Sequence, residues 1–159
     1  MLLRFFAVLL AGMLALPLFA ADKKPLDHTV YDGWKRISNE TIASDGSRVM
    51  YVIEPQEGDA ALVVRTVRTG TSDTVQRATV PKFSYDSRFA AFILKAPFAD
   101  TKKAKIAKKK PDQMPKDTLA ILRFDADSLV RIPRVRSFTF PEKAAGWIVY
   151  QVEKDSAKA

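Results

Sequence analysis

The sequence predicts an all-β fold, and three observations lead to this prediction. Segments rich in β-branched and aromatic residues recur at intervals of about 8–12 residues, each bounded by Gly, Pro, Asp or Ser. After the N-terminal apolar run no segment shows a convincing apolar period of 3.6 residues, and only residues 30–37 come close to one. A ten-residue motif also recurs along the chain, which indicates a repeat architecture.

The N-terminus has the pattern of a secretory signal peptide over residues 1–20. Arg4 provides a basic start, residues 5–19 are almost all apolar, and Ala20 offers a small-residue cleavage site. The apolar run is shorter than the roughly 20 residues that a spanning helix needs. We therefore expect a signal-peptide helix and an exported protein, periplasmic or extracellular, whose mature part covers residues 21–159. An uncleaved anchor is the alternative, because Leu18 fits the cleavage pattern poorly.

Strand candidates follow one another through the mature chain. The segments 48–54 and 60–67, joined by the polar residues 55–59, predict a β-hairpin. Residues 68–74, rich in Gly, Ser and Thr, are expected to form a loop. The further strand candidates are residues 88–96, 118–125, 129–133, 134–140 and 146–153.

The repeated motif joins the end of one strand to the start of the next. Residues 42–51 (IASDGSRVMY) align without gaps with residues 83–92 (FSYDSRFAAF), and more weakly with residues 138–147 (FTFPEKAAGW). Asp45 and Asp86 stand at the turn, where an Asp side chain bonds backbone N–H groups. Hairpins repeated at this spacing are typical of the four-stranded blades of a β-propeller, with an ordinary β-sandwich as the alternative. We expect the first two to three blades of an incomplete propeller.

The net charge of +8 is concentrated in the lysine-rich segment 101–117, which holds seven lysines and two aspartates. Pro111 and Pro115 interrupt any long amphipathic helix there, so we expect a solvated loop inserted into the propeller. This insertion accounts for the distance between the second and third copies of the motif, which is longer than the distance between the first and second copies. Contact with an anionic membrane surface or an acidic partner is the alternative. Nucleic acid is not expected as a partner, because the segment has neither arginine nor aromatic residues.

No residue pattern of a catalytic, cofactor-binding or metal site is found. The chain has no cysteine, which excludes a thiolate nucleophile and a zinc–thiolate site. None of its six glycines starts a G-x-S-x-G motif, and its only histidine, His28, is expected to be a surface or packing residue.

Two carboxylate pairs are expected to be turn formers. Asp125 and Asp127 flank a predicted turn, and two spaced carboxylates are too few for a calcium loop. Asp45 and Asp86 belong to the turns of the repeated motif.

Two further groups of residues have a structural and a binding interpretation. Trp34 and Trp147 are expected to be packing aromatics, with a binding platform as the alternative. The run Arg131, Arg134 and Arg136 is expected to form a solvated strand face, with a site for a peptide carboxylate as the alternative.

The motif F-S-x-D-S-R-F-A-A-F, followed by I-L-K-A-P-F-A-D-T-K-K-A-K, resembles the first blades of the N-terminal propeller in the prolyl oligopeptidase family of serine peptidases. The likeness is greatest to exported bacterial members and spans residues 26–154, the lysine-rich insertion included. In these peptidases the propeller covers a C-terminal α/β-hydrolase domain and admits only peptides, which a Ser–Asp–His triad hydrolyses. No residue of this chain matches that triad.

The resemblance implies the N-terminal propeller fragment of a secreted serine peptidase, inactive alone, with substrate gating as its part in peptide hydrolysis. We then expect peptide substrates to bind through the missing catalytic domain. We expect the chain to contact a membrane only through its signal peptide, before cleavage. No cofactor or metal is implied. The alternative is a stand-alone exported binding module of the TolB-type propeller kind, which holds a partner through the lysine-rich segment.

Overall fold

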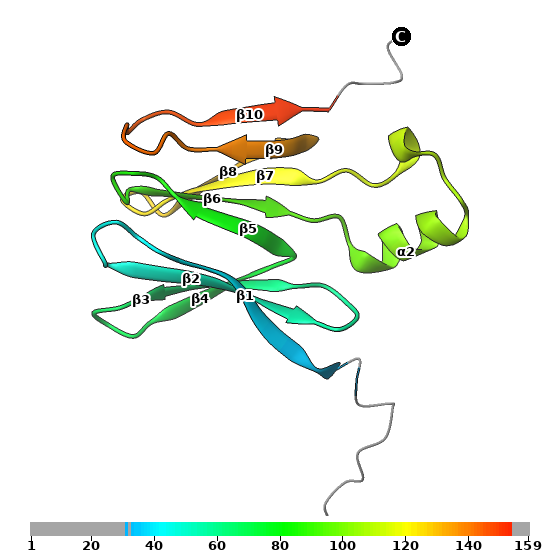
Figure 1. The fold of residues 1–159 in the computed structure, drawn as a ribbon, viewed down its shortest axis with the longest axis horizontal. Helices are drawn as coiled ribbons and strands as arrows, with labels where there is room; N and C mark the ends of the chain where they lie inside the picture. The colour runs from blue at the N-terminus through cyan, green and yellow to red at the C-terminus, as the bar shows by residue number, and fades with distance from the viewer. Residues whose placement is uncertain (1–30, 32, 154–159) are drawn as a thin grey trace, which may run out of the picture.

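A computed structural model describes Tyr31 and residues 33–153, in which three antiparallel sheets are stacked one above another (Figure 1). The predicted signal peptide and His28 lie outside the described residues. Below, the three sheets are called the first, second and third blade, in chain order.

The blades are consecutive in sequence, and every strand is antiparallel to its neighbour. The first blade holds β1 (Lys35–Ile42), β2 (Arg48–Pro55), β3 (Ala61–Thr66) and β4 (Ser72–Gln76). The second holds β5 (Ala78–Phe83), β6 (Phe89–Leu94), β7 (Thr118–Arg123) and β8 (Ser128–Pro133). The third pairs β9 (Val135–Thr139) with β10 (Val149–Val152). Spatial order equals chain order, so each blade is a meander.

The predicted strands are present, but the loop predicted over residues 68–74 is too long, and two strands, β1 and β5, were not among the predicted candidates. β1 overlaps residues 30–37, which came closest to a helical period in the sequence. The β2–β3 hairpin confirms the prediction from residues 48–54 and 60–67. The predicted loop is too long, because β4 already begins at Ser72, which pairs with Arg65. Ser and Asp are poor strand formers, and pairing with β3 decides the conformation here rather than local preference.

The first two copies of the repeated motif share their hydrogen bonds. The amide of Ala43 donates to the Arg48 carbonyl oxygen at 2.9 Å, and 41 residues later the amide of Ser84 donates to the Phe89 carbonyl oxygen at 3.0 Å. In each copy these bonds close the turn between the first and second strands of the blade. The sequence repeat is therefore a repeat of backbone structure.

Unusual backbone angles recur at the same spacing. Gly46 (φ 68°) and Ser87 (φ 58°) occupy the left-handed region in equivalent turns. Asn39 and Val80, both at φ 52°, lie at equivalent bulges, where the pairing of β1 with β2 and of β5 with β6 shifts register. Left-handed conformations are rare for residues other than glycine, so their recurrence shows that the two blades have one backbone design.

The third copy of the motif matches only at its first end. Phe138 lies in β9, as predicted, and is buried. Trp147, aligned with Phe92, lies in no strand and is 74% exposed. Thr139 pairs with Val149, which leaves a longer connection than the six residues between Phe83 and Ala90 in the second blade. Pro and Glu replace the Asp turn here, and the longer loop displaces Trp147.

The loop predicted over the lysine-rich segment is wrong for its first part. α2 spans Phe98–Ile106, and a short 3₁₀ turn, η2, spans Pro111–Gln113. The helix begins directly after Pro97 and ends before Pro111, so neither proline interrupts it. Alanine and lysine are good helix formers, and lysines in its last turn suit the helix dipole. The fold is therefore mostly β rather than all-β.

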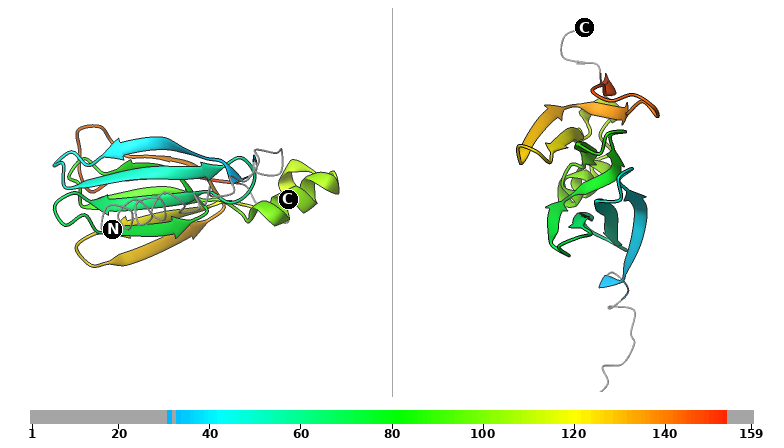
Figure 2. Two further views of the ribbon diagram at one scale, coloured as in Figure 1. Left: turned by 90° about the horizontal axis from the view of Figure 1, so that it is seen from below. Right: turned by 90° about the vertical axis from the view of Figure 1, so that its left-hand side faces the viewer.

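Two hydrophobic clusters join the blades. One lies between the first and second blades and the other between the second and third. The second blade is thus buried on both faces: Ala90 and Phe92 face the first blade, whereas Ala91 and Ile93 face the third. Meandering four-stranded sheets packed face to face are the architecture of propeller blades. The described residues form part of a β-propeller, with the layers seen end on in Figure 2 (right).

Candidate functional site

The second and third strands of the second blade are joined by a long excursion, residues 95–117, which includes α2 and η2. The same connection in the first blade takes only residues 56–60. The excursion projects beyond the ends of the strands (Figure 2, left). Lys102 of α2 forms an ion pair with Glu57, and the Phe98 amide donates to Asp59 Oδ1 at 2.8 Å. These contacts fasten the excursion to the first blade.

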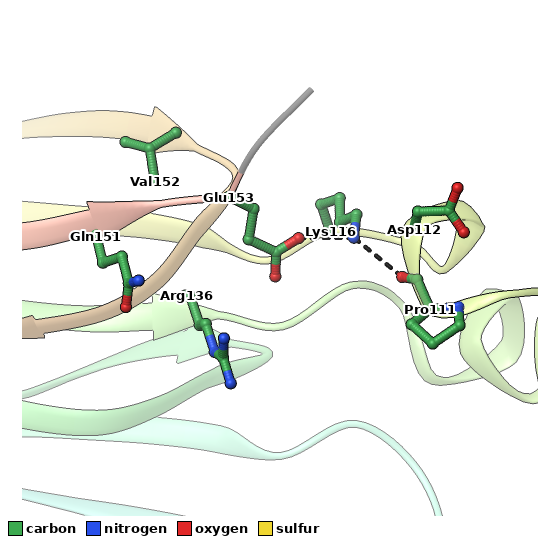
Figure 3. A pocket seen from close by; sticks show the side chains of 7 residues that line it. All are labelled: Pro111, Asp112, Lys116, Arg136, Gln151, Val152 and Glu153. Carbon is green, nitrogen blue, oxygen red and sulfur yellow. Dashed lines mark hydrogen bonds and ion pairs between the residues drawn. The ribbon is translucent and has the colours of Figure 1, made fainter. Parts of the chain in front are cut away.

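At its far end the excursion meets the third blade, and an open pocket of about 600 Å³ lies between them (Figure 3). Lys116 Nζ lies 2.6 Å from Glu153 Oε2 and donates to the Pro111 carbonyl oxygen at 3.1 Å. The pair is partly buried, with the side chains 26% and 31% exposed. The pocket is lined by Pro111, Asp112, Lys116, Arg136, Gln151, Val152 and Glu153.

Of the three candidate arginines, only Arg136 lines this pocket. Arg131 lies on β8 of the second blade, Arg134 at the bend between blades, and Arg136 on β9 of the third. The expectation of a single strand face is therefore wrong, because the chain changes sheet within the run. Among the described residues Arg136 has no hydrogen-bond or ion-pair partner. A guanidinium presents a planar fork that suits a carboxylate, so Arg136 offers this pocket a site for an anionic group.

A second depression, of about 370 Å³, lies where the excursion leaves the first two blades. Its polar groups are engaged with one another. Asp117 accepts from Lys95 Nζ at 2.7 Å and from the Ala96 amide at 3.2 Å. Asp59 accepts from the Phe98 amide. These carboxylates position the excursion, and we assign them no chemistry.

The Asp residues of the repeated motif hold their turns, as predicted. Asp45 Oδ1 accepts from the Ser47 amide at 2.9 Å, which lowers the pKa of Asp45. Asp86 Oδ1 accepts from the Ser84 hydroxyl at 2.6 Å, which lowers the pKa of Asp86. A carboxylate that is stabilised in its ionised form is a poor general acid or base at neutral pH.

Asp125 is held by two arginines in the turn between β7 and β8. Arg123 Nη2 lies 2.9 Å and Arg88 Nη2 3.1 Å from its Oδ2. Their hydrogen bonds lower the pKa of Asp125 to about 2. Asp127 is in the same turn, at φ 43°. Within the described residues, no three His, Cys, Asp or Glu side chains gather in a way that could hold a metal ion.

The two tryptophans are exposed, so the expectation of packing aromatics is wrong for both. Trp34 is 58% exposed and makes an edge-on contact with Tyr31, with ring centroids 4.8 Å apart. Trp147 lines a small apolar pocket of about 200 Å³ together with Ser84, Phe89, Ile121, Phe140, Gly146 and Ile148. Among the described residues no helix combines the length and the apolar character that crossing a bilayer requires.

Neither a protein-family model nor a curated protein sequence matches the chain. Among solved structures, it is similar to an acylaminoacyl peptidase from Pyrococcus horikoshii, with a TM-score of 0.52 and 15% identity over 75% of this chain and 18% of that chain. An acylaminoacyl peptidase in complex with Z-Gly-Gly-Phe-chloromethyl ketone gives a TM-score of 0.52 and 14% identity, over 73% of this chain and 17% of that chain.

The chain spans less than a fifth of the length of these peptidases. A likeness at this low identity shows the fold alone. Together with the stacked meanders described above, it shows that the chain has the fold of part of a β-propeller, similar to part of the acylaminoacyl peptidase structures.

Proposed function

We propose that this chain is the propeller part of a secreted serine peptidase of the prolyl oligopeptidase family, where it restricts a catalytic α/β-hydrolase domain to peptide substrates. One observation carries the proposal. Two complete blades and a third sheet stack in an arrangement that matches acylaminoacyl peptidase over three quarters of the chain.

The chemistry of the described residues supports a gating role rather than a catalytic one. The turn carboxylates are bound to arginine, hydroxyl or amide donors, as described for Asp45, Asp86 and Asp125. The sequence holds no G-x-S-x-G motif. In this proposal, the nucleophile and its base are supplied by the rest of a longer product.

The outer face of the first blade supports the presence of further blades. At the spacing of the repeat, its residues Val49 and Tyr51 correspond to Ala90 and Phe92 of the second blade, which are fully buried against the first blade. On the first blade this face is only half-buried, and its strand β1 adds Ile42, which is 67% exposed. A neighbouring blade would cover this apolar surface, as the first blade covers the second.

Arg136 is the residue that we propose to contact peptides. It lies on β9, the first strand of its blade, and the blades of a propeller surround a central channel that a peptide can enter. Its guanidinium, without a partner among the described residues, offers a carboxylate or a peptide carbonyl two parallel donors.

The experiment begins with the coding sequence that follows codon 159. The proposal expects an in-frame continuation with further blades and a G-x-S-x-G motif, and a product that cleaves short peptides but not folded proteins. Arg136→Gln should raise KM for peptides with a free carboxylate, whereas the matched change Arg131→Gln, on β8, should not.

A stop at this point, with a purified chain that binds a partner and cleaves nothing, would contradict the peptidase assignment. It would favour the alternative, a stand-alone exported binding module. An active product in which Arg136→Gln leaves KM unchanged would contradict only the role of Arg136.

A further inference from the structure

The end of α2 has the backbone geometry of a Schellman motif. The Lys109 amide donates to the Ala104 carbonyl oxygen at 3.1 Å, and the Lys108 amide donates to the Lys105 carbonyl oxygen at 3.0 Å. Lys108, at φ 49°, is the left-handed residue that reverses the chain. The motif fixes the direction in which the chain leaves the helix, and it folds Lys109 back over the last turn.

The residue at the left-handed position is unusual. Glycine is the common choice there, because a side chain in the left-handed region costs roughly 1–2 kcal/mol. The hydrophobic contact that often accompanies this motif would need an apolar residue at position 109, where this chain has lysine. The helix end is thus less stable than its geometry allows. Lys108 stands where glycine would avoid the strain, and Lys109 stands where an apolar residue would make the hydrophobic contact.

Five lysines gather at this end of the helix, and we call them the lysine cap: Lys103, Lys105, Lys108, Lys109 and Lys110. All five are exposed, and none forms an ion pair within the described residues. Their neighbours Lys95, Lys102 and Lys116 do pair, with Asp117, Glu57 and Glu153. The acidic residues near this excursion pair with these three lysines and not with the lysine cap, so the cap keeps its positive charge.

An exposed apolar residue lies among these charges. Ile106 is the last residue of α2 and is 74% exposed, with Lys105 before it and the run from Lys108 to Lys110 after it. α2 buries only Ala104, so the helix presents nearly all its other side chains to solvent. The excursion carries this end beyond the strand ends, as Figure 2 (left) shows for α2.

We propose that the lysine cap, with Ile106 at its centre, docks this protein on the phosphate headgroups of an anionic phospholipid bilayer. Lysine clusters of this size bind anionic lipid surfaces, each lysine near the surface contributing about 1 kcal/mol. A projecting end with many point charges suits a plane of many phosphates, and Ile106 can enter the headgroup layer.

Other polyanions fit this end less well. The cap has no arginine for bidentate contacts and no aromatic residue for stacking on bases, which disfavours a nucleic acid. A surface that binds an acidic protein is expected to hold its cations in fixed orientations through neighbouring acidic side chains. The five lysines of the cap have long flexible side chains, and residues 103–110 contain no Asp or Glu. The proposal adds a membrane contact to the one expected from the signal peptide, and it does not depend on the peptidase assignment.

The test measures binding of the full chain to vesicles of 30% phosphatidylglycerol in phosphatidylcholine and to vesicles of phosphatidylcholine alone. The readout is the ratio of the two partition coefficients, so that an apolar contribution common to both vesicles cancels. Replacing Lys103, Lys105, Lys109 and Lys110 by Gln should lower this ratio by about 600-fold at low salt, since each lysine contributes about 1 kcal/mol, or about fivefold. The matched control replaces four other exposed cations by Gln, namely Lys35, Arg68, Arg131 and Lys143, and should lower the ratio much less.

A second variant separates binding from folding. Lys108→Gly relieves the left-handed strain and should raise the melting temperature, yet it should lower the vesicle ratio about fivefold through the loss of one charge. A loss of binding in a more stable protein cannot result from unfolding.

Three outcomes would overturn the proposal. The first is an unchanged ratio in the quadruple variant or an equal loss in its control. The second is full competition by millimolar inorganic phosphate at constant ionic strength, which would indicate a site for a single phosphate. The third is tight binding of polyglutamate without binding to anionic vesicles, which would indicate an acidic protein partner.

Discussion

The first and second blades share one backbone design but not one environment. On the face that points toward the start of the stack, the first blade has Val49 and Tyr51 where the second has Ala90 and Phe92. The latter two are fully buried, whereas the former are half-buried. The repeat therefore sets the turns and the strand register, and the neighbouring sheet sets the burial. The difference is visible in sequence, because β6 is apolar without interruption and β2 has polar or charged residues at its ends.

The largest expected effect compares the buried aromatic of one blade with its counterpart in the other. Phe92→Ala should lower the free energy of unfolding by about 3–5 kcal/mol, because Phe92 is fully buried between the blades. Tyr51→Ala should cost less, about 1–2 kcal/mol, because its ring is only partly buried. Urea unfolding of the two variants measures this difference. Equal losses would show that the outer face of the first blade is covered in solution.

A smaller effect compares the two equivalent turns. Gly46→Ala should destabilise the chain by about 1 kcal/mol, because φ is 68° although no atom lies within 4 Å of the added Cβ. Ser87→Gly removes the same strain, but it also removes the bond from the Asp45 amide to Ser87 Oγ at 3.2 Å, so its net effect should be under about 0.5 kcal/mol. Thermal unfolding distinguishes the two, and a destabilisation by Ser87→Gly equal to that of Gly46→Ala would contradict the shared design.

The smallest effect is a difference in acid sensitivity between the β7–β8 and β3–β4 turns. Asp125 has a pKa of about 2 in the fold, below its usual value, so its contribution to stability is present above about pH 4 and is lost as the pH falls toward 2. The β3–β4 turn, residues 67–71, contains no carboxylate. Hydrogen exchange at pH 5 and pH 2.5 should therefore show a greater loss of protection in β7–β8 than in β3–β4.

Asp125→Asn provides the control for that measurement. The variant should lose some stability at neutral pH and should show no added sensitivity of β7–β8 between pH 4 and 2. A wild-type chain that loses protection equally in both hairpins would argue against the role of the two arginines around Asp125.

Much of the fold could be predicted from local sequence. Runs of β-branched and other apolar residues identified β2, β3 and β6, and the Asp turns identified the first two copies of the repeat. The helix α2 was missed because it buries only Ala104 and so has no apolar period. Its signals were present in another form: Pro97 before it, Asp100 in its first turn and lysines in its last.

The candidate site could be predicted only in part. Arg136 was named as a candidate, but its pocket depends on the ion pair of Lys116 with Glu153, which joins the excursion to the third blade. No local pattern predicts that contact, because the two residues meet only through sheet packing. The sequence repeat could not predict the exposure of Trp147 either, because this exposure depends on the length of the β9–β10 loop, which the repeat does not define.

The most direct test of the proposed function is to find the catalytic serine in the native product. Antibodies raised against the purified chain would isolate the protein from its source cells, and a fluorophosphonate probe would label an active-site serine covalently. We predict a labelled polypeptide several times longer than 159 residues, in keeping with the less than one fifth of the matched peptidases that this chain spans. An unlabelled polypeptide no longer than this chain would contradict the proposal.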